Sequence, residues 1–130
     1  MCKISVVTIC FNNLEELKRT CSSVDKQTET PYEHWIIDGS KSNDIYNWLS
    51  SISQPSFRKW ICEPDKGIAD AFNKGIQQST GEVVQLLNAA DEYATDDVLA
   101  MVAKTFDSDE RFQWLTGKIY MTRVGSKVLV

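Results

Sequence analysis

The sequence predicts an α/β domain with a mainly parallel sheet and helices on both faces. Four short runs rich in β-branched and apolar residues alternate with four stretches whose apolar residues recur every three or four positions. Strands joined through helices in this way pair in parallel, and the connecting helices cover the sheet. The 130 residues fit a single domain.

The four strands are expected over residues 4–10, 34–38, 58–62 and 82–87. The first strand is nearly all apolar or β-branched, which is typical of a parallel strand covered on both faces. After residue 110 the alternation stops. A strand-like run over 112–115 and a hairpin of residues 118–123 and 127–130, turning around Gly125 and Ser126, are expected there.

Each strand is followed by a helix whose apolar residues share one face. These residues are Leu14, Leu17, Cys21 and Val24 in the first helix, Ile45, Trp48, Leu49 and Ile52 in the second, Ile68, Phe72 and Ile76 in the third, and Val98, Met101, Val102 and Phe106 in the fourth. Asn12 or Asn13 is expected to cap the first helix. Gly81 is expected in the left-handed conformation that follows the third helix.

The composition argues against several classes of partner. A formal net charge of −4 argues against a nucleic-acid or anionic-membrane surface, and no apolar run approaches the ~20 residues that a transmembrane helix needs. The four cysteines form no C-x-x-C pair and no secretory hydrophobic segment follows Met1, so we expect reduced thiols and a cytoplasmic protein. The only histidine, His34, and the four tryptophans are expected to be packing residues.

Polar side chains follow all four strands at their carboxyl ends. They are Asn12 and Asn13, Asp38 and Ser40, Glu63, Asp65 and Lys66, and Asn88 and Asp91. Ligands of open α/β sheets bind just beyond this edge. Amide groups, carboxylates and a lysine gathered there predict a site for a nucleotide and a hard divalent cation. The sequence contains neither G-x-G-x-x-G after the first strand nor a P-loop motif, so a Rossmann dinucleotide site and a P-loop are not expected.

Four segments together resemble one enzyme family. They are Ile4–Asn12, the Ile37-Asp38-Gly39-Ser40 step, the loop and helix of Glu63–Ile76, and the strand and acidic turn of Gly81–Glu92. In this order and spacing they resemble the N-terminal portion of inverting, nucleotide-sugar-dependent glycosyltransferases with the GT-A fold, the family 2-like group. The resemblance covers about residues 3 to 106.

The resemblance implies a role for each matching residue. Asp38 would hydrogen-bond the base, the backbone of Thr8 to Cys10 would meet it, and the loop–helix segment would border the base, ribose and phosphates. The implied nucleotide-sugar-binding residues are Thr8, Ile9, Cys10, Asn12, Asp38, Asp65, Lys66, Asp70, Asn73, Asn88 and Ala89. Asp91 would hold Mg²⁺ or Mn²⁺ on the diphosphate.

The implied activity is transfer of a sugar, with inversion, from a nucleotide diphosphate-sugar to a hydroxyl of a glycan or lipid-linked acceptor. A UDP-sugar is the first expectation for the donor, in polysaccharide or cell-envelope glycan synthesis at the cytoplasmic face of the membrane. The general base is expected beyond Val130, so no catalytic residue is assigned. Residues 1–130 are expected to form a single nucleotide-sugar-binding domain, part of a longer glycosyltransferase and inactive alone.

Two departures from the family pattern leave alternatives open. Asn88 stands where the metal motif usually has its first aspartate, and Ala90 precedes Asp91, so fewer charges face a cation. Gly39 stands where many members carry a second acid, so a single carboxylate, that of Asp38, is expected to serve. A non-catalytic nucleotide-binding module and a plain interaction domain on the same fold remain alternatives.

Overall fold

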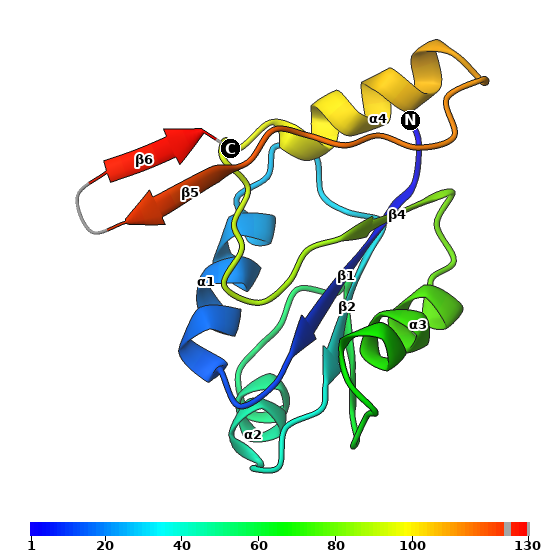
Figure 1. The fold of residues 1–130 in the computed structure, drawn as a ribbon. Coiled ribbons are helices and arrows are strands. Elements are labelled where there is room, and N and C mark those ends of the chain that lie inside the picture. Colours follow the sequence, from blue (N-terminus) through cyan, green and yellow to red (C-terminus); the bar gives the residue numbers. More distant parts are fainter. Residues whose placement is uncertain (124–125, 130) are drawn as a thin grey trace.

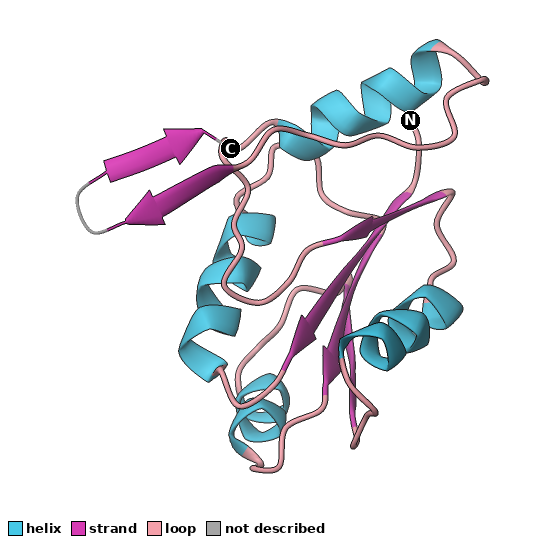
Figure 2. Ribbon diagram, viewed as in Figure 1, coloured by secondary structure: helices cyan, strands magenta, loops and turns pink. Residues whose placement is uncertain are grey.

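A four-stranded parallel sheet forms the centre of the fold, as the sequence predicts (Figures 1 and 2). The structure is a computed structural model, and it describes residues 1–123 and 126–129. The strands are β1 (Ile4–Cys10), β2 (Glu33–Asp38), β3 (Arg58–Cys62) and β4 (Val83–Leu86). They lie in the order β3-β2-β1-β4, and every neighbouring pair is parallel. The expected strand bounds are confirmed to within one residue at each end.

Four helices cover both faces of this sheet. They are α1 (Leu14–Asp25), α2 (Asp44–Ser51), α3 (Ile68–Gln78) and α4 (Val98–Ser108). Side chains of α1, α2 and α4 pack against one face, and side chains of α3 pack against the other. In Figure 1, α3 accordingly lies alone to the right of the sheet. The predicted α/β class, with helices on both faces, is confirmed.

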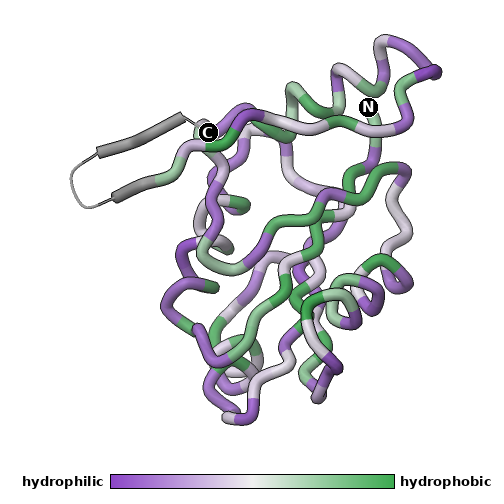
Figure 3. Tube along the Cα trace, viewed as in Figure 1, coloured by the Kyte–Doolittle hydropathy of each residue, from purple (hydrophilic) through white to green (hydrophobic). Residues whose placement is uncertain are grey.

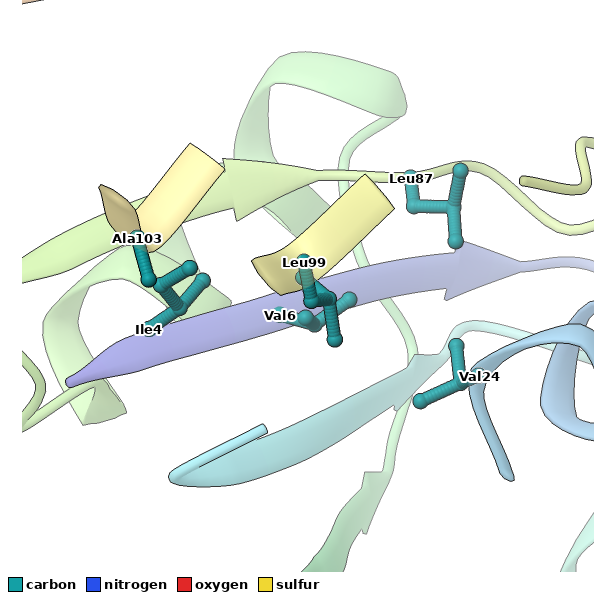
Figure 4. Packing of buried hydrophobic residues seen from close by; sticks show 6 residues of the cluster. All are labelled: Ile4, Val6, Val24, Leu87, Leu99 and Ala103. Carbon is teal, nitrogen blue, oxygen red and sulfur yellow. The ribbon is translucent and has the colours of Figure 1, made fainter. Parts of the chain in front are cut away.

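Alternate residues of β1 supply the two halves of the core. Ile4 and Val6 point toward α4, where they meet Leu99 and Ala103, and Figure 4 shows Leu87 and Val24 completing this cluster. Figure 3 shows the hydrophobic residues concentrated along the strands. Full burial of a side chain such as Leu99, which is 1% exposed, contributes about 1.5–3 kcal/mol to folding.

The opposite face of β1 packs against α3 at short range. Val7 and Ile9 meet Ala71 of α3, together with Ile37 of β2. A Cβ atom added to Gly75 would lie 2.2 Å from Cγ1 of Val7, so only glycine lets the helix approach the sheet this closely. This contact fixes α3, and therefore the loop in front of it, relative to the strand ends.

Two expectations about local backbone structure are wrong. Gly81 does not have a positive φ; it is glycine because an added Cβ would lie 2.5 Å from the Ser5 hydroxyl oxygen and 2.8 Å from the Lys3 carbonyl oxygen. Asn13 occupies the N-cap position of α1, but its side-chain oxygen accepts from the Phe11 N–H at 2.9 Å instead of capping the helix. In both places a tertiary or loop contact overrides the local rule.

The predicted C-terminal hairpin is present, whereas the strand over 112–115 is not. β5 (Tyr120–Arg123) and β6 (Ser126–Leu129) pair antiparallel and project away from the main sheet in Figure 1. Residues 112–115 lie in a loop, and Trp114 is 77% exposed, so its expected packing role is wrong. Gly125, expected in the hairpin turn, and Val130 lie outside the described residues.

A buried polar chain runs through the core beside α1. Arg58 is 5% exposed, and its guanidinium donates to Nδ1 of His34 at 3.3 Å and pairs with Asp25 at 2.5 Å. Since Nδ1 of His34 accepts these bonds, Nε2 carries the hydrogen and donates to the Thr8 hydroxyl at 2.8 Å. His34 is fully buried, which confirms its structural role. Burial, together with the Arg58 charge, holds the pKa of His34 well below its ordinary value.

This neutral histidine predicts a pH dependence of stability. Below the ordinary histidine pKa of about 6.5, His34 is protonated in the unfolded chain but stays neutral in the folded chain. The free energy of unfolding therefore falls as the pH falls. The free energy of unfolding should drop by about 1.4 kcal/mol between pH 7.5 and 5.5, measured by urea denaturation. His34→Gln, whose amide can also accept from Arg58 and donate to Thr8, should lose this dependence. Equal stability of the wild type at both pH values would contradict a buried neutral imidazole.

Candidate functional site

The carboxyl ends of three strands are aligned by the register of the sheet. Cys10 of β1 lies opposite Asp38 of β2, which lies opposite Cys62 of β3. Backbone bonds extend this alignment past the strands, because the Gly39 N–H donates to the Cys10 carbonyl at 3.1 Å and the Glu63 N–H donates to the Asp38 carbonyl at 3.0 Å. The polar loops that follow these strands are therefore held side by side, at the lower end of the sheet in Figure 1.

A cleft of about 640 Å³ lies at this edge, between the start of α2 and the loop that follows β3. Its lining residues are Phe11, Asp38, Gly39, Ser40, Lys41, Ser42, Asn43, Tyr46, Cys62, Glu63, Pro64 and Asp65. The volume falls in the range of about 300–1,000 Å³ that is usual for sites of small molecules and cofactors. Of the polar residues expected at the strand ends, the cleft brings together Asp38, Ser40, Glu63 and Asp65. Asp38 and Asp65 are the two of these that the resemblance implies as nucleotide-sugar-binding residues.

Asp38 is buried, 3% exposed, and its carboxylate is oriented by the protein. One oxygen accepts from the Ser40 N–H at 2.9 Å and from the Cys10 thiol at 3.9 Å. Burial and the adjacent Asp38 carboxylate raise the pKa of the Cys62 thiol to about 12, and they also raise that of Cys10. Both thiols therefore remain protonated at neutral pH and behave as weak hydrogen-bond donors toward the carboxylate.

Asn12 joins the loop after β1 to the loop after β2. Its backbone has a φ of 54°, in the left-handed region that asparagine tolerates better than most residues. The Asn12 N–H donates to the Ser40 hydroxyl at 2.7 Å, and its side-chain oxygen accepts from the Lys41 N–H at 3.2 Å. Asn12 thus shapes the rim of the cleft without being among its lining residues.

The loop before α3 is organised by its own carboxylates. Asp65 accepts from the Gly67 N–H through Oδ1 at 2.9 Å, and Asp70 accepts from the Lys66 N–H at 2.8 Å. Gly67 has a φ of 116°, which only glycine adopts readily. Lys66 and Asn73 are exposed and lie outside the set of residues that line the cleft, so the lysine of the cleft is Lys41.

The acidic turn after β4 is anchored on β1 and α1. The Ala89 N–H donates to the Ile9 carbonyl at 3.0 Å, which places Asn88 and Ala89 next to the end of β1. The buried Thr20 hydroxyl accepts from the Ala90 N–H at 3.0 Å and donates to the Asp91 carbonyl at 2.7 Å. Ala90 has a φ of 83°, a strained conformation for alanine, so the contacts of Thr20 hold the turn in its shape.

Asp91 has the properties of a partial cation ligand. It is exposed, and no residue that the structure describes donates a hydrogen bond to its carboxylate. Within residues 1–123 and 126–129, no three His, Cys, Asp or Glu side chains gather into a group that could hold a metal ion. Mg²⁺ commonly takes one or two protein carboxylates and completes its shell with substrate phosphates and water. Asp91 fits such a site only together with a bound diphosphate.

Some residues that were predicted to bind the ligand instead form hydrogen bonds within the protein. The Thr8 hydroxyl is occupied by His34 in the core, and the carbonyl oxygens of Ile9 and Cys10 already accept from backbone N–H groups. Lys66 and Asp91, expected in the same cleft as Asp38, are not among the residues that line it.

Several residues of the cleft were not predicted from the sequence. The most informative are Phe11 and Tyr46, which are 54% and 50% exposed, and Lys41. Phe11 and Lys41 directly follow strand-end motifs, and this position in the sequence could have identified them as residues of the cleft. Tyr46 gave none, because it sits on the expected solvent face of a short helix.

The chain matches the sequence profile described as Glycosyl transferase family 2 over residues 5–123. The chain belongs to this family. Two relatives support the assignment. An uncharacterised glycosyltransferase of Mycobacterium tuberculosis is 39% identical over 102 residues, covering 78% of the chain and 38% of the relative. One from Nostoc sp. is 33% identical over 91 residues, covering 68% of the chain and 28% of the relative. The chain thus spans less than two fifths of the length of these relatives.

Solved structures share the fold of this family 2 chain. A mannosyltransferase from Pyrobaculum calidifontis, in complex with GDP-Man and Mn²⁺, superposes with a TM-score of 0.69 at 20% identity, covering 81% of this chain and 32% of that one. S. aureus TarS, in complex with UDP-GlcNAc, superposes with a TM-score of 0.64 at 18% identity, covering 82% and 31% of the two chains. Both likenesses place the sheet and helices in the GT-A fold. None of the helices in the described part of the chain is long and apolar enough to cross a membrane.

Proposed function

We propose that residues 1–130 form the nucleotide-sugar-binding domain of a glycosyltransferase that transfers a sugar from a UDP-sugar to an acceptor hydroxyl, with inversion. The observation that carries this proposal is the cleft at the carboxyl ends of β1, β2 and β3, with a buried, oriented Asp38 in its wall. Membership of glycosyl transferase family 2 supports the reaction class. The neighbouring structures, with GDP-Man and UDP-GlcNAc, support a nucleotide-sugar as the ligand.

The lining of the cleft suits a nucleoside. Uracil carries one ring N–H donor, which a fixed carboxylate such as Asp38 can accept. The exposed rings of Phe11 and Tyr46 offer apolar faces for a base to stack on. Lys41 supplies a positive charge among the lining residues, and phosphate oxygens are its natural partners.

The remaining strand-end residues are proposed to border the ribose and diphosphate. Asn88, Ala89 and Asp91 lie beside the end of β1, and Lys66, Asp70 and Asn73 lie on the loop and first turns of α3. Asp91 would hold Mg²⁺ or Mn²⁺ together with the diphosphate oxygens. When bound, such an ion supplies Lewis-acid stabilisation of the charge on the departing diphosphate.

In the proposed chemical step, bonds form and break between the donor and the acceptor, and this domain contributes little to that step beyond binding. The acceptor oxygen forms a bond to the anomeric carbon as the bond from that carbon to the diphosphate oxygen breaks, and the electron pair of that bond remains on the diphosphate. In-line attack on the face opposite the diphosphate gives inversion. The proton of the acceptor hydroxyl goes to a general base, which we place outside residues 1–130. This chain's contribution is to bind and orient the donor.

The acceptor is proposed to be a glycan or a lipid-linked molecule, in polysaccharide or cell-envelope glycan synthesis. A relative from Mycobacterium bovis, 25% identical over 120 residues, is named as a PGL/p-HBAD biosynthesis glycosyltransferase, which supports sugar transfer in a biosynthetic pathway. The match covers 90% of this chain and 46% of that relative.

Nucleotide binding should depend on Asp38. Asp38→Asn should weaken UDP binding by about 10- to 100-fold, because a hydrogen bond to a charged group contributes about 1.5–3 kcal/mol. Titration calorimetry with UDP measures this. Asp96→Asn, an exposed acid in the turn before α4, is the matched control and should bind like the wild type. Unchanged UDP affinity in Asp38→Asn would contradict the proposed base site.

Metal enhancement of binding should depend on Asp91. Mn²⁺ should tighten UDP binding by the wild type, and chelation with EDTA should remove the gain. Asp91→Asn should bind UDP with the same affinity in Mn²⁺ and in EDTA, because Asn88 and Ala90 leave no second charge for the ion. Glu92→Gln removes the adjacent exposed acid and should retain the enhancement. Equal enhancement in Asp91→Asn and the wild type would show that the cation lies elsewhere.

A further inference from the structure

The glycine that follows Asp38 lies under the carboxylate of another strand-end loop. Gly39 is buried, and a Cβ atom added to it would lie 2.0 Å from Oδ2 and 2.7 Å from Cγ of Asp65. The φ of Gly39 lies outside the left-handed region, so its backbone alone would accept other residues. A side chain at position 39 would therefore displace the Asp65 carboxylate, which is the far end of a flexible side chain.

Asp65 is held in this place by its own loop. Its Oδ1 accepts from the Gly67 N–H at 2.9 Å, at the start of α3. Its Oδ2 lies over Gly39 and accepts no hydrogen bond from any residue that the structure describes. Both Asp65 and Gly39 line the cleft next to Asp38. One oxygen of Asp65 thus fixes the side chain, and the other is available to a ligand in the cleft.

We propose that Gly39 is a positioning residue that makes room for Asp65 to act as a second nucleoside-recognising carboxylate beside Asp38. The inference rests on the proposed nucleotide-binding function and specifies how this cleft recognises its ligand. Two carboxylates in one cleft favour groups that donate hydrogen bonds, and a nucleoside offers them as ribose hydroxyls and base N–H groups. The close approach of positions 39 and 65 also couples the residues that can stand at these two positions. A side chain at position 39 and the carboxylate of residue 65 would occupy the same space, so a side chain at position 39 displaces Asp65 from its place beside Asp38.

This arrangement changes the expectation drawn from Gly39 in the sequence. A single carboxylate, Asp38, was expected at the end of β2. The structure instead brings the Asp65 carboxylate, from the loop after β3, to the position beside Asp38. The acid that the second strand lacks is supplied by its neighbour in the sheet.

Calorimetric titration of UDP into a set of variants tests the proposal. Asp65→Asn keeps the bond to Gly67 and the volume over Gly39 but replaces the free acceptor with a donor, and should bind UDP about tenfold more weakly. Gly39→Ala should lose a similar factor by displacing Asp65. In an Asp65→Gly background Gly39→Ala should cause no further loss, and Gly39→Asp should restore affinity to within threefold of the wild type. Asp44→Asn, an exposed acid just outside the cleft, is the control for charge and should bind as the wild type does.

The outcomes separate this inference from the proposed function. If Asp65→Asn binds UDP like the wild type while Asp38→Asn does not, the inference is overturned and the binding site stands. If Gly39→Asp lowers affinity equally with and without Asp65, the two positions are not coupled, and the inference is also overturned. If the wild type binds no nucleotide, the proposed function itself fails. Thermal unfolding of each variant checks that lost affinity does not come from lost folding, and rescue by Gly39→Asp cannot come from a merely structural effect.

Discussion

The parallel pairing of β2 with both β1 and β3 is the interaction on which the rest of the site depends. It places Cys10, Asp38 and Cys62 in one row, and backbone bonds from Gly39 and Glu63 carry the alignment into the loops. A shift of β2 by one residue would turn Asp38 to the opposite face of the sheet, since neighbouring residues of a strand point to opposite sides. It would also separate Asp65 from Gly39. The cleft is thus a consequence of strand register rather than of any single loop.

The two ends of the sheet have different tasks. At the amino end, the buried Glu33 accepts from Ser5 at 2.7 Å and from the Thr80 N–H at 2.5 Å, and it pairs with Lys59 at 3.3 Å. Burial would raise the pKa of Glu33, but these bonds outweigh burial and hold the pKa below its ordinary value. Its contribution to stability is therefore present above the ordinary pKa of a glutamate and lost in acid. Both carboxylate oxygens of Glu33 have protein partners, whereas Oδ2 of Asp65 and the Asp91 carboxylate at the other end remain available to a ligand.

Sequence reasoning succeeded where a local pattern determines the structure. The four strands and helices follow from the spacing of apolar residues, and Asp38 follows from its place at a strand end. It failed where distant segments meet. An added Cβ would clash with Ser5 and Lys3 at Gly81 and with the Asp65 carboxylate at Gly39, and neither contact has a signal in the local sequence. Thr20 reads as an ordinary helix residue, yet it holds the strained turn at Ala90. The site is therefore predictable as an edge of the sheet but not as a set of contacts.

The central claim is that a nucleotide binds at the carboxyl ends of β1, β2 and β3. A second pocket, of about 330 Å³, lies between α1 and the end of α2, where Lys18 and Lys26 offer positive charges that attract phosphates nonspecifically. Titration of ¹⁵N-labelled protein with UDP, followed by amide chemical shifts, distinguishes the two locations directly. The largest changes are expected in residues 38–46 and 62–65. Changes confined to residues 18–26 and 52–58 would contradict the central claim.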